Sequence, residues 1–559
     1  LYQNLFREQE ALVSAYDPDR NCDFILCIPI ADRPEHLRGC LESILQLCHL
    51  YAYGGKNRGS FSKVSVIIVE DSKERENVKR DIELAEAYTQ QGLQVHHYGL
   101  QEQYELMLRV PADVRQAVSS IIGDPSAEDF YHKGQAVARN LGYLKMLQIA
   151  SDRERTLFYF VDSDQQFRVN RTTPDGDEYV YGLNYFYYIN RLFKTHDIDM
   201  LTGKLVCDPP VSPSVMAANF LDDVIAFFQQ LSHHAPHQVC QFHPQQRAMP
   251  GEAAYHDMAH LFGFEQQAES YDYSCPLRHV HDHVACLQSF AKRINYFFFG
   301  EHLTRKSYFH YQGPFTDLSP ARTIYPGNYI TNFEGLKYII PFGKLRLRMS
   351  GPTAGRLIQS EVHSRFASAN LPMLHARSLS GYGALDGDFE DEYRPGVESS
   401  MDTIDLSDEF ERQFFGDLML FTVDRLAQSG VAIEECTQRN LAEAFAQVES
   451  ELLELYDDKH RRVRQKCRQL SEIVNDEASW WNRVETVSAS IAQVKQFIDN
   501  IQHNFGEQSK ACQRIHSKSH RQQRVAEMQK ALSDYRHDRN AWDRMLDSFR
   551  DSSEPARHH

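Results

Sequence analysis

The stretch Leu157-Phe-Tyr-Phe-Val-Asp-Ser-Asp-Gln-Gln-Phe167 sets the fold prediction for this chain. Apolar and aromatic residues run directly into two aspartates, and such a run predicts a strand that is buried on both faces. Ligands of open parallel sheets bind beyond the carboxyl ends of the strands, where Asp162 and Asp164 would lie. Residues i and i+2 of an extended segment point to the same side, so both carboxylates would face one divalent cation. The alternative is a solvated acidic turn.

Length, charge and cysteine usage limit the class of protein. A chain of 559 residues is too long for one core, so we expect two or three domains. The formal net charge of −17 argues against a nucleic-acid-binding surface. No apolar run reaches the ~18 residues of a membrane span, and the first residues do not predict a signal peptide. The 11 cysteines lack C-x-x-C spacing, which favours reduced thiols in a cytoplasmic protein.

Strand-like and helix-like segments alternate after a polar, helical extension over residues 1–20. Apolar strand patterns at 22–30 and 64–69 are each followed by an amphipathic helical pattern. This alternation predicts a doubly wound α/β domain over residues 21–380. Asp32 follows the first strand, and Asp71 follows the second.

A further motif, K-G-x-x-x-A-R-N-x-G, spans Lys133–Gly142 and opens the helix before the Asp162-Ser-Asp164 strand. The order of these four motifs resembles the GT-A glycosyltransferases, in the broad family-2-like group that uses nucleotide sugars. The resemblance covers residues 20–205 well and 320–380 in outline. It implies a Rossmann-like mixed sheet and a nucleotide-diphosphate sugar as donor.

The resemblance also assigns roles to residues. Contacts to the nucleotide sugar fall on five side chains: Asp32, Asp71, Lys133, Arg139 and Asp162. A Mn²⁺ or Mg²⁺ ion falls on Asp164 with Asp162. The alternatives are ordinary ones: Asp71 caps the next helix, and Lys133 and Arg139 are surface charges.

Two residues farther along the chain join the predicted site. A strand-like segment ends at Asp208-Pro-Pro210, because proline cannot donate to a ladder, and we place Asp208 close to the sugar or acceptor as a catalytic residue. Several retaining GT-A enzymes supply a third metal ligand from a histidine after the catalytic core, and His375 has that placement. The alternatives are a rigid turn at Asp208 and a packed core histidine at 375.

One departure from the resemblance bears on mechanism. Inverting members carry Glu-Asp where this chain has Pro352-Thr353, so the usual base for the acceptor hydroxyl is absent. We therefore expect retention of the donor's anomeric configuration. The alternative is an inverting enzyme in which Glu301 acts as the catalytic base.

Residues 214–320 form a predicted insertion that is rich in histidine and aromatic residues. The pattern His279-x-His-x-His283 suggests a metal site, but alternating histidines lack the spacing of a strong one. The interpretation that we favour is a polar insertion that shapes an acceptor pocket.

The last third of the chain changes character. Residues 381–405 are rich in Gly, Asp, Glu and Ser and predict an acidic linker or lid. Residues 406–550 have apolar positions at helical spacing, which predicts a helical bundle domain. We expect these helices to support a homodimer.

The predicted function is a metal-dependent glycosyltransferase that moves a sugar from a nucleotide-diphosphate sugar to a hydroxyl acceptor. A second hypothesis is a catalytically silent GT-A-like scaffold whose helices are an interaction module. A third is nucleotidyl transfer, although no glycine-rich loop of that kind follows the first strand.

Overall fold

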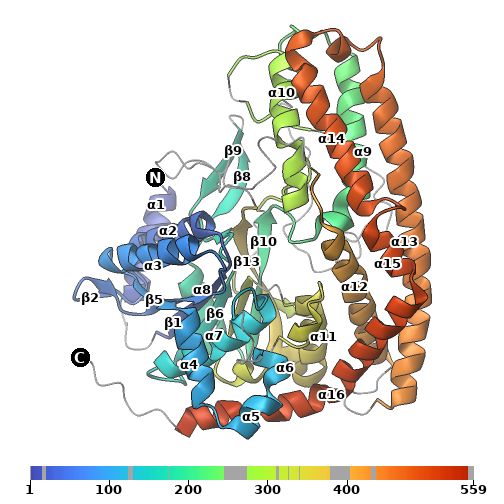
Figure 1. The fold of residues 1–559 in the computed structure, drawn as a ribbon. Helices are drawn as coiled ribbons and strands as arrows, with labels where there is room; N and C mark the ends of the chain where they lie inside the picture. The colour runs from blue at the N-terminus through green and yellow to red at the C-terminus, as the bar shows by residue number, and fades with distance from the viewer. Residues whose placement is uncertain are drawn as a thin grey trace.

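The computed structural model describes most of the chain. The described residues are 2–15, 21–123, 130–173, 176–243, 273–277, 279–309, 314–324, 327–338, 340–377, 403–429, 433 and 436–551. Within them, the chain forms an α/β body with a mixed central sheet and a C-terminal helical region, so the expected fold class is confirmed at that level (Figure 1). The predicted linker at 381–405 lies outside the described residues, except for its last three.

The central sheet has nine strands within the described residues. The strand order along its main path is β11-β13-β10-β12-β6-β1-β4-β5, and β7 pairs with β13. The bounds are β1 (Asp23–Ile30), β4 (Val64–Glu70), β5 (Gln94–Tyr98), β6 (Thr156–Val161), β7 (Gln165–Gln166), β10 (Met200–Cys207), β11 (Leu318–Pro320), β12 (Asn328–Thr331) and β13 (Phe366–His375).

Strand direction decides where the strands end. β5, β4, β1 and β6 are parallel, and β12 runs antiparallel to both β6 and β10. β10 is therefore parallel to β6, and β13 is parallel to β10. The carboxyl ends of β1, β4, β6, β10 and β13 consequently meet at one edge of the sheet.

Alternate side chains of the central strands enter two different apolar cores, as the period of two in a strand requires. In β1, Leu26 and Ile28 face the core under one layer of helices, whereas Ile25 and Cys27 face the other core. The first layer contains α2 (Pro34–Tyr51), α3 (Arg75–Gln90) and α8 (Tyr185–Thr195). The second contains α4 (Leu100–Arg109), α6 (Ser119–Ile122), α7 (Gln135–Ile149) and α11 (Ser350–Val362).

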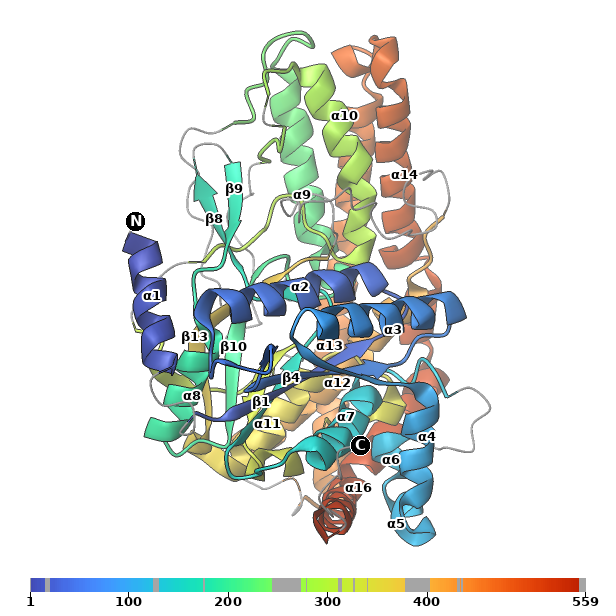
Figure 2. The same cartoon turned by 90° about the vertical axis from the view of Figure 1, so that its left-hand side faces the viewer.

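The helical region is built from two separate parts of the chain, residues 213–294 and the C-terminal helices. α9 (Pro213–Ser232) packs against α13 (Gln438–Asn475), and α10 (His283–Ile294) packs against α14 (Ser488–Phe505). Figure 2 shows α9, α10 and α14 standing together beyond the sheet. The helices of the predicted insertion thus share one core with the C-terminal helices, including α12 (Ser407–Gln428) and α15 (Lys510–His516).

The last helix links this helical region back to the sheet. α16 (Lys518–Asp551) runs from the helical region to the base of the α/β body (Figure 1). Trp542 is fully buried among residues of the second sheet core, and its indole N–H donates to the carbonyl of Leu336 at 3.0 Å.

The remaining elements are short or peripheral. They are α1 (Tyr2–Ala15), α5 (Ala112–Ala117), the hairpins β2 (Lys56–Asn57) with β3 (Ser60–Phe61) and β8 (Val169–Thr173) with β9 (Gly176–Val180), and the 3-10 helices η2 (Asn295–Phe299), η3 (Glu334–Lys337), η4 (Gly343–Leu345), η5 (His363–Arg365), η7 (Trp480–Asn482) and η8 (Glu485–Val487). Among the described residues, no helix combines the length and the apolar character that crossing a membrane requires.

Candidate functional site

The residues selected from the sequence follow the parallel strands whose carboxyl ends share one edge. Each lies at or just beyond the end of a different strand, apart from the two aspartates that both follow β6. The residues are Asp32 after β1, Asp71 after β4, Asp162 and Asp164 after β6, Asp208 after β10, and His375 at the end of β13. The topology thus gathers residues that are up to 343 positions apart (375 − 32).

Asp164 and His375 are in contact. Nε2 of His375 lies 3.6 Å from Oδ2 of Asp164, and both residues are buried. Nδ1 of His375 lies 2.8 Å from the main-chain carbonyl of Asp208, which can only accept, so Nδ1 carries the proton and donates it. In the neutral ring Nε2 then presents its lone pair to a carboxylate, an arrangement that favours a cation, or a proton on Nε2, between them.

Two arginines complete the surroundings of Asp164. NH1 of Arg377 lies 3.5 Å from Oδ2 of Asp164, and NH1 of Arg33 lies 3.8 Å from the same oxygen. Burial opposes ionisation, but His375, Arg377 and Arg33 together hold the pKa of Asp164 well below its usual range. The carboxylate is therefore negative at neutral pH. The Arg33 side chain is 44% exposed, so its guanidinium is accessible to an anionic ligand.

Asp162 has a different partner. Its carboxylate forms an ion pair with the guanidinium of Arg139, whose side chain is 2% exposed. Its main-chain N–H donates to Oε1 of Gln165 at 3.3 Å. Arg139 is thus a buried group beside the strand end, and the alternative of a surface charge is wrong.

Asp71 organises the loop that precedes α7. Its Oδ1 accepts the main-chain N–H of Lys133 at 2.9 Å and pairs with Nζ of the same lysine at 2.8 Å. Its Oδ2 accepts the N–H of Gly134 at 3.2 Å. Burial lowers the pKa of Lys133, and the charge of Asp71 opposes that shift. The alternative of Lys133 as a surface charge is also wrong, because its side chain is 6% exposed.

Asp32, not Asp71, accepts hydrogen bonds at the start of α3. Its carboxylate accepts the N–H groups of Lys73 at 3.1 Å and Glu74 at 3.0 Å. Nε2 of His132 lies 2.7 Å from its Oδ2. Although burial opposes it, these main-chain hydrogen bonds lower the pKa of Asp32. Asp32 and Asp71 therefore tie the segment around 132–134 to the ends of β1 and β4.

Asp208 and Glu301 are two fully buried carboxylates beside this edge. Oδ2 of Asp208 accepts the main-chain N–H of Arg377 at 3.0 Å. Glu301 forms an ion pair with Arg293. Lys306 is close to both carboxylates: burial lowers its pKa, but the charges of Cys207, Asp208 and Glu301 outweigh burial and raise it.

Pro352 and Thr353, which the resemblance places at the base position of inverting enzymes, lie in α11. Thr353 is buried in α11, and its hydroxyl donates to the carbonyl of Met349 at 2.8 Å. This hydroxyl therefore satisfies a carbonyl at the start of its own helix.

Sequence reasoning missed Arg33 and Arg377. Arg33 directly follows Asp32, and Arg377 lies two positions after His375. Each arginine is therefore close to a strand end in the sequence, and this position could have indicated it. Their contacts with Asp164 span 131 (164 − 33) and 213 positions, and only the sheet topology brings them together.

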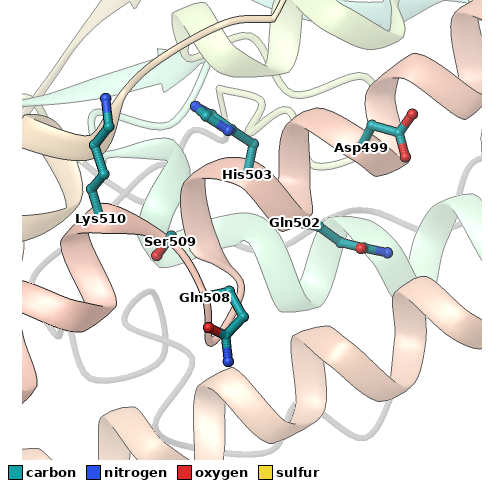
Figure 3. A pocket seen from close by; sticks show the side chains of 6 residues that line it. All are labelled: Asp499, Gln502, His503, Gln508, Ser509 and Lys510. Carbon is teal, nitrogen blue, oxygen red and sulfur yellow. The ribbon is translucent and has the colours of Figure 1, made fainter.

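A separate hollow lies on the helical region, where α14 meets α15. It has a volume of about 330 Å³ and is lined by Asp499, Gln502, His503, Gln508, Ser509 and Lys510. Figure 3 shows that these side chains point in different directions and do not converge on one point. None of them is a residue that the sequence analysis selected.

Comparison of the chain with protein-family models and with curated proteins finds no match.

Proposed function

We propose that this protein is a metal-dependent glycosyltransferase of the GT-A type, which moves a sugar from a nucleotide-diphosphate sugar to a hydroxyl acceptor with retention. The observation that carries the proposal is the contact between Asp164, at the end of the central strand β6, and Nε2 of His375, at the end of β13. A buried carboxylate opposite an oriented imidazole, at the carboxyl edge of an α/β sheet, is the expected surrounding for a ligand.

The donor set fits the proposed ion. Carboxylate oxygens suit Mg²⁺ and Mn²⁺, and an imidazole nitrogen is an acceptable partner for Mn²⁺. Asp164 and His375 would hold the ion. The expectation that Asp162 faces the same ion is not met among the described residues: its carboxylate is paired with Arg139, and Asp162, Asp164 and His375 do not form a group of ligand atoms within 4.8 Å of one another. When bound, such an ion would neutralise the negative charge that develops on the departing diphosphate.

The chain's own residues supply the remaining steps. Arg33 and Arg377 surround Asp164 with positive charge and would hold phosphate oxygens of the donor. The carboxylate of Asp71 fixes the main chain at Lys133 and Gly134, where the proposed nucleotide loop enters α7. Asp162 and Arg139 fix the turn after β6.

We infer retention from the two positions at which a base for the acceptor hydroxyl was expected. Thr353 cannot take a proton from a sugar hydroxyl near neutral pH, and Glu301 is held by Arg293. The oxygen of the departing phosphate would accept the proton of the acceptor hydroxyl on the same face. No carboxylate base is then required.

The decisive experiment measures hydrolysis of nucleotide-sugar donors by the full chain with Mn²⁺, with EDTA, and in the Asp164→Ala variant. We expect turnover only with the ion and only with Asp164 intact. Asp197→Ala is the matched control, because the side chain of Asp197 is 91% exposed. Turnover that survives both EDTA and Asp164→Ala would disprove the proposal.

The second candidate is a catalytically silent scaffold with the helices as an interaction module. Its support is the large helical surface rich in exposed charge, for example Arg439 paired with Glu443 on α13. Absence of any thermal shift with Mn²⁺ and UDP-, GDP- or CDP-sugars would favour it.

We also propose a cytoplasmic homodimer formed through the helices of residues 406–550. None of the 11 cysteines, all of which are described, forms a disulfide, and this supports a reducing compartment. The mass of the full chain in solution tests the dimer. Truncation before residue 406 is unsuitable, because α9 and α10 would lose the core that they share with α13 and α14.

A further inference from the structure

Four potential metal ligands meet where the chain connects α9 to α10, apart from the Asp164 edge. They are Cys240, His243, Cys275 and His281, and one side-chain atom from each lies within 4.8 Å of all the others. Both cysteines are buried, His281 is half-buried and His243 is exposed. The cluster therefore has a thiol side toward the protein and an imidazole side open to solvent.

We propose that Cys240, His243, Cys275 and His281 bind one Zn²⁺ ion as a structural site. Two thiolates and two imidazoles are a standard ligand set for zinc, which binds four such ligands in a tetrahedron. Zinc binds sulfur at about 2.3 Å and nitrogen at about 2.0–2.1 Å, so four tetrahedral ligand atoms lie less than 4.8 Å from one another. The four atoms of the cluster already meet this limit and need only small shifts to bind one ion. Binding would displace the protons of the two thiols.

Main-chain hydrogen bonds align the three ligand-bearing segments without any metal. The N–H of Cys240 donates to the carbonyl of His281 at 2.9 Å, and Val239 and Asp282 form an antiparallel bridge. The N–H of Cys275 donates to the carbonyl of Phe242 at 2.9 Å. The backbone thus brings the segment of Cys240 and His243 against Cys275 and His281, which are more than 30 positions away in the sequence.

The ring of His281 is oriented as a metal ligand. Its Nδ1 lies 2.6 Å from the carbonyl of His279, so Nδ1 donates its proton there. Nε2 then carries the lone pair, and it lies 3.2 Å from Sγ of Cys275. Metal-binding histidines in proteins almost always fix their second nitrogen in this way.

The neighbouring histidines and the third cysteine are not in the ligand set. His283 uses both ring nitrogens, one 2.9 Å from the carbonyl of Ala235 and the other 3.1 Å from the N–H of Gln241. Cys286, on α10, is fully buried and contacts the thiols of Cys240 and Cys275. It does not belong to the set of ligand atoms that all lie within 4.8 Å of one another.

A smaller cluster in the helical region is a weaker candidate. Its members are His460, Cys512 and His516, which offer three ligands instead of four. Nε2 of His516 lies 3.1 Å from a carboxylate oxygen of Asp457, so that nitrogen already has a partner.

With four protein ligands the site would be closed to substrate, which is the property of structural zinc sites. The ion would link Cys240 and His243, before residue 244, to Cys275 and to His281, which lies just before α10. Since α10 packs against α14, the ion would fix this end of the helical region. The inference does not depend on the proposed glycosyl transfer.

The test uses the full chain, loaded with one equivalent of Zn²⁺, passed through a desalting column and analysed for metal content. We expect about one zinc per chain, and X-ray absorption should show two sulfur and two nitrogen neighbours. His243→Ala should lose at least tenfold in zinc affinity, and this exposed substitution leaves the core intact. Cys240→Ser and Cys275→Ser should lose the zinc, with folding checked by circular dichroism.

Two controls separate this site from others. His279→Ala should keep the zinc, because it removes an exposed ring but leaves the carbonyl that orients His281. Asp164→Ala should also keep it, whatever becomes of the proposed activity. Failure of the full chain to retain zinc, retention of zinc by folded Cys240→Ser and Cys275→Ser, or loss of zinc in Asp164→Ala would each overturn the assignment.

Discussion

Nε2 of His375 lies 3.6 Å from Oδ2 of Asp164, while Nδ1 of the same ring is held by the main-chain carbonyl of Asp208 at 2.8 Å. The ends of three strands, β6, β10 and β13, are joined through one imidazole. The orientation of the ring depends on the main chain after β10, so a substitution of the Asp208 side chain leaves this hydrogen bond in place.

The first prediction concerns that imidazole. His375→Ala removes a nitrogen ligand from the proposed ion but leaves Asp164 with its two arginines. We expect the affinity for Mn²⁺ to fall by at least about tenfold, because changes next to a metal typically cost 10–100-fold. Electron paramagnetic resonance of free Mn²⁺, with the nucleotide diphosphate present, measures the affinity.

The control for this measurement is His537→Ala, an exposed histidine on α16. Equal affinity for Mn²⁺ in His375→Ala and in the unmodified chain would contradict a ligand role. His375 would then be the packed core histidine that the sequence left as an alternative.

The second prediction concerns the buried pair of Arg139 and Asp162. Arg139→Met keeps most of the side-chain volume but leaves the Asp162 carboxylate without its guanidinium. We expect the free energy of unfolding to fall by about 3 kcal/mol, the lower end of the usual cost of removing one partner of a buried ion pair, because the Asp162 side chain is 20% exposed. Urea unfolding measures it, and a change within about 0.5 kcal/mol would show that the pair is unimportant for stability.

A double-mutant cycle adds Asp162→Asn, measured alone and in combination with Arg139→Met. If the pair acts as a unit, the double variant loses less stability than the sum of the two single variants.

The strand ends could be predicted from the sequence, but their partners could not. The apolar run before Asp162 forms a strand that ends at Val161. A run of five apolar residues that is followed by polar residues is typical of a strand buried on both faces. Nothing local to Asp164 indicates Arg377, which is 213 positions away and arrives through β13. Asp71 shows the same limit: its position after β4 was predictable, whereas its hydrogen bonds to Lys133 and Gly134 depend on the loop before α7.

The proposed zinc cluster shows a second kind of limit. Sequence spacing drew attention to His279, His281 and His283, and only His281 belongs to the cluster. The two cysteines have no C-x-x-C partner, and they meet through main-chain hydrogen bonds between distant segments. Motif spacing detects ligands on one turn or hairpin, and it does not detect ligands that the tertiary fold brings together.

The third prediction is a dependence of stability on pH that arises from Asp417 in α12. Burial raises the pKa of Asp417 to about 7, against the hydrogen bond from Tyr456 and the charge of Lys459. The folded state therefore keeps a proton between about pH 4 and 7 that the unfolded state has lost. This contribution to stability is complete below pH 4 and is lost as the pH rises to 7.

Asp417→Asn stays neutral at every pH and can keep both hydrogen-bond partners, Tyr456 at 2.5 Å and Gln413 at 2.7 Å. We expect its stability relative to the unmodified chain to increase by about 2 kcal/mol between pH 5 and pH 7. Urea unfolding at the two pH values measures the change. A difference that is independent of pH would show that Asp417 titrates normally in the fold.

The last prediction is the stereochemical outcome, and it depends on the state of Glu301. An inverting enzyme needs a base on the acceptor face, and loss of that base typically reduces the rate by 10²–10⁴-fold. Glu301 is fully buried and its carboxylate is paired with Arg293, so it is not exposed to an acceptor hydroxyl. Thr353, which the resemblance places at the position of that base, donates its hydroxyl proton to the carbonyl of Met349 at the start of its own helix.

We therefore expect the product to keep the anomeric configuration of the donor, read from the proton NMR coupling of freshly formed product. Glu301→Gln should lower the rate by less than about tenfold once the variant is shown to be folded, since no proton passes through this residue. A β-linked product from an α-linked donor, together with a rate loss of more than about 10²-fold in Glu301→Gln, would instead make Glu301 the base of an inverting reaction.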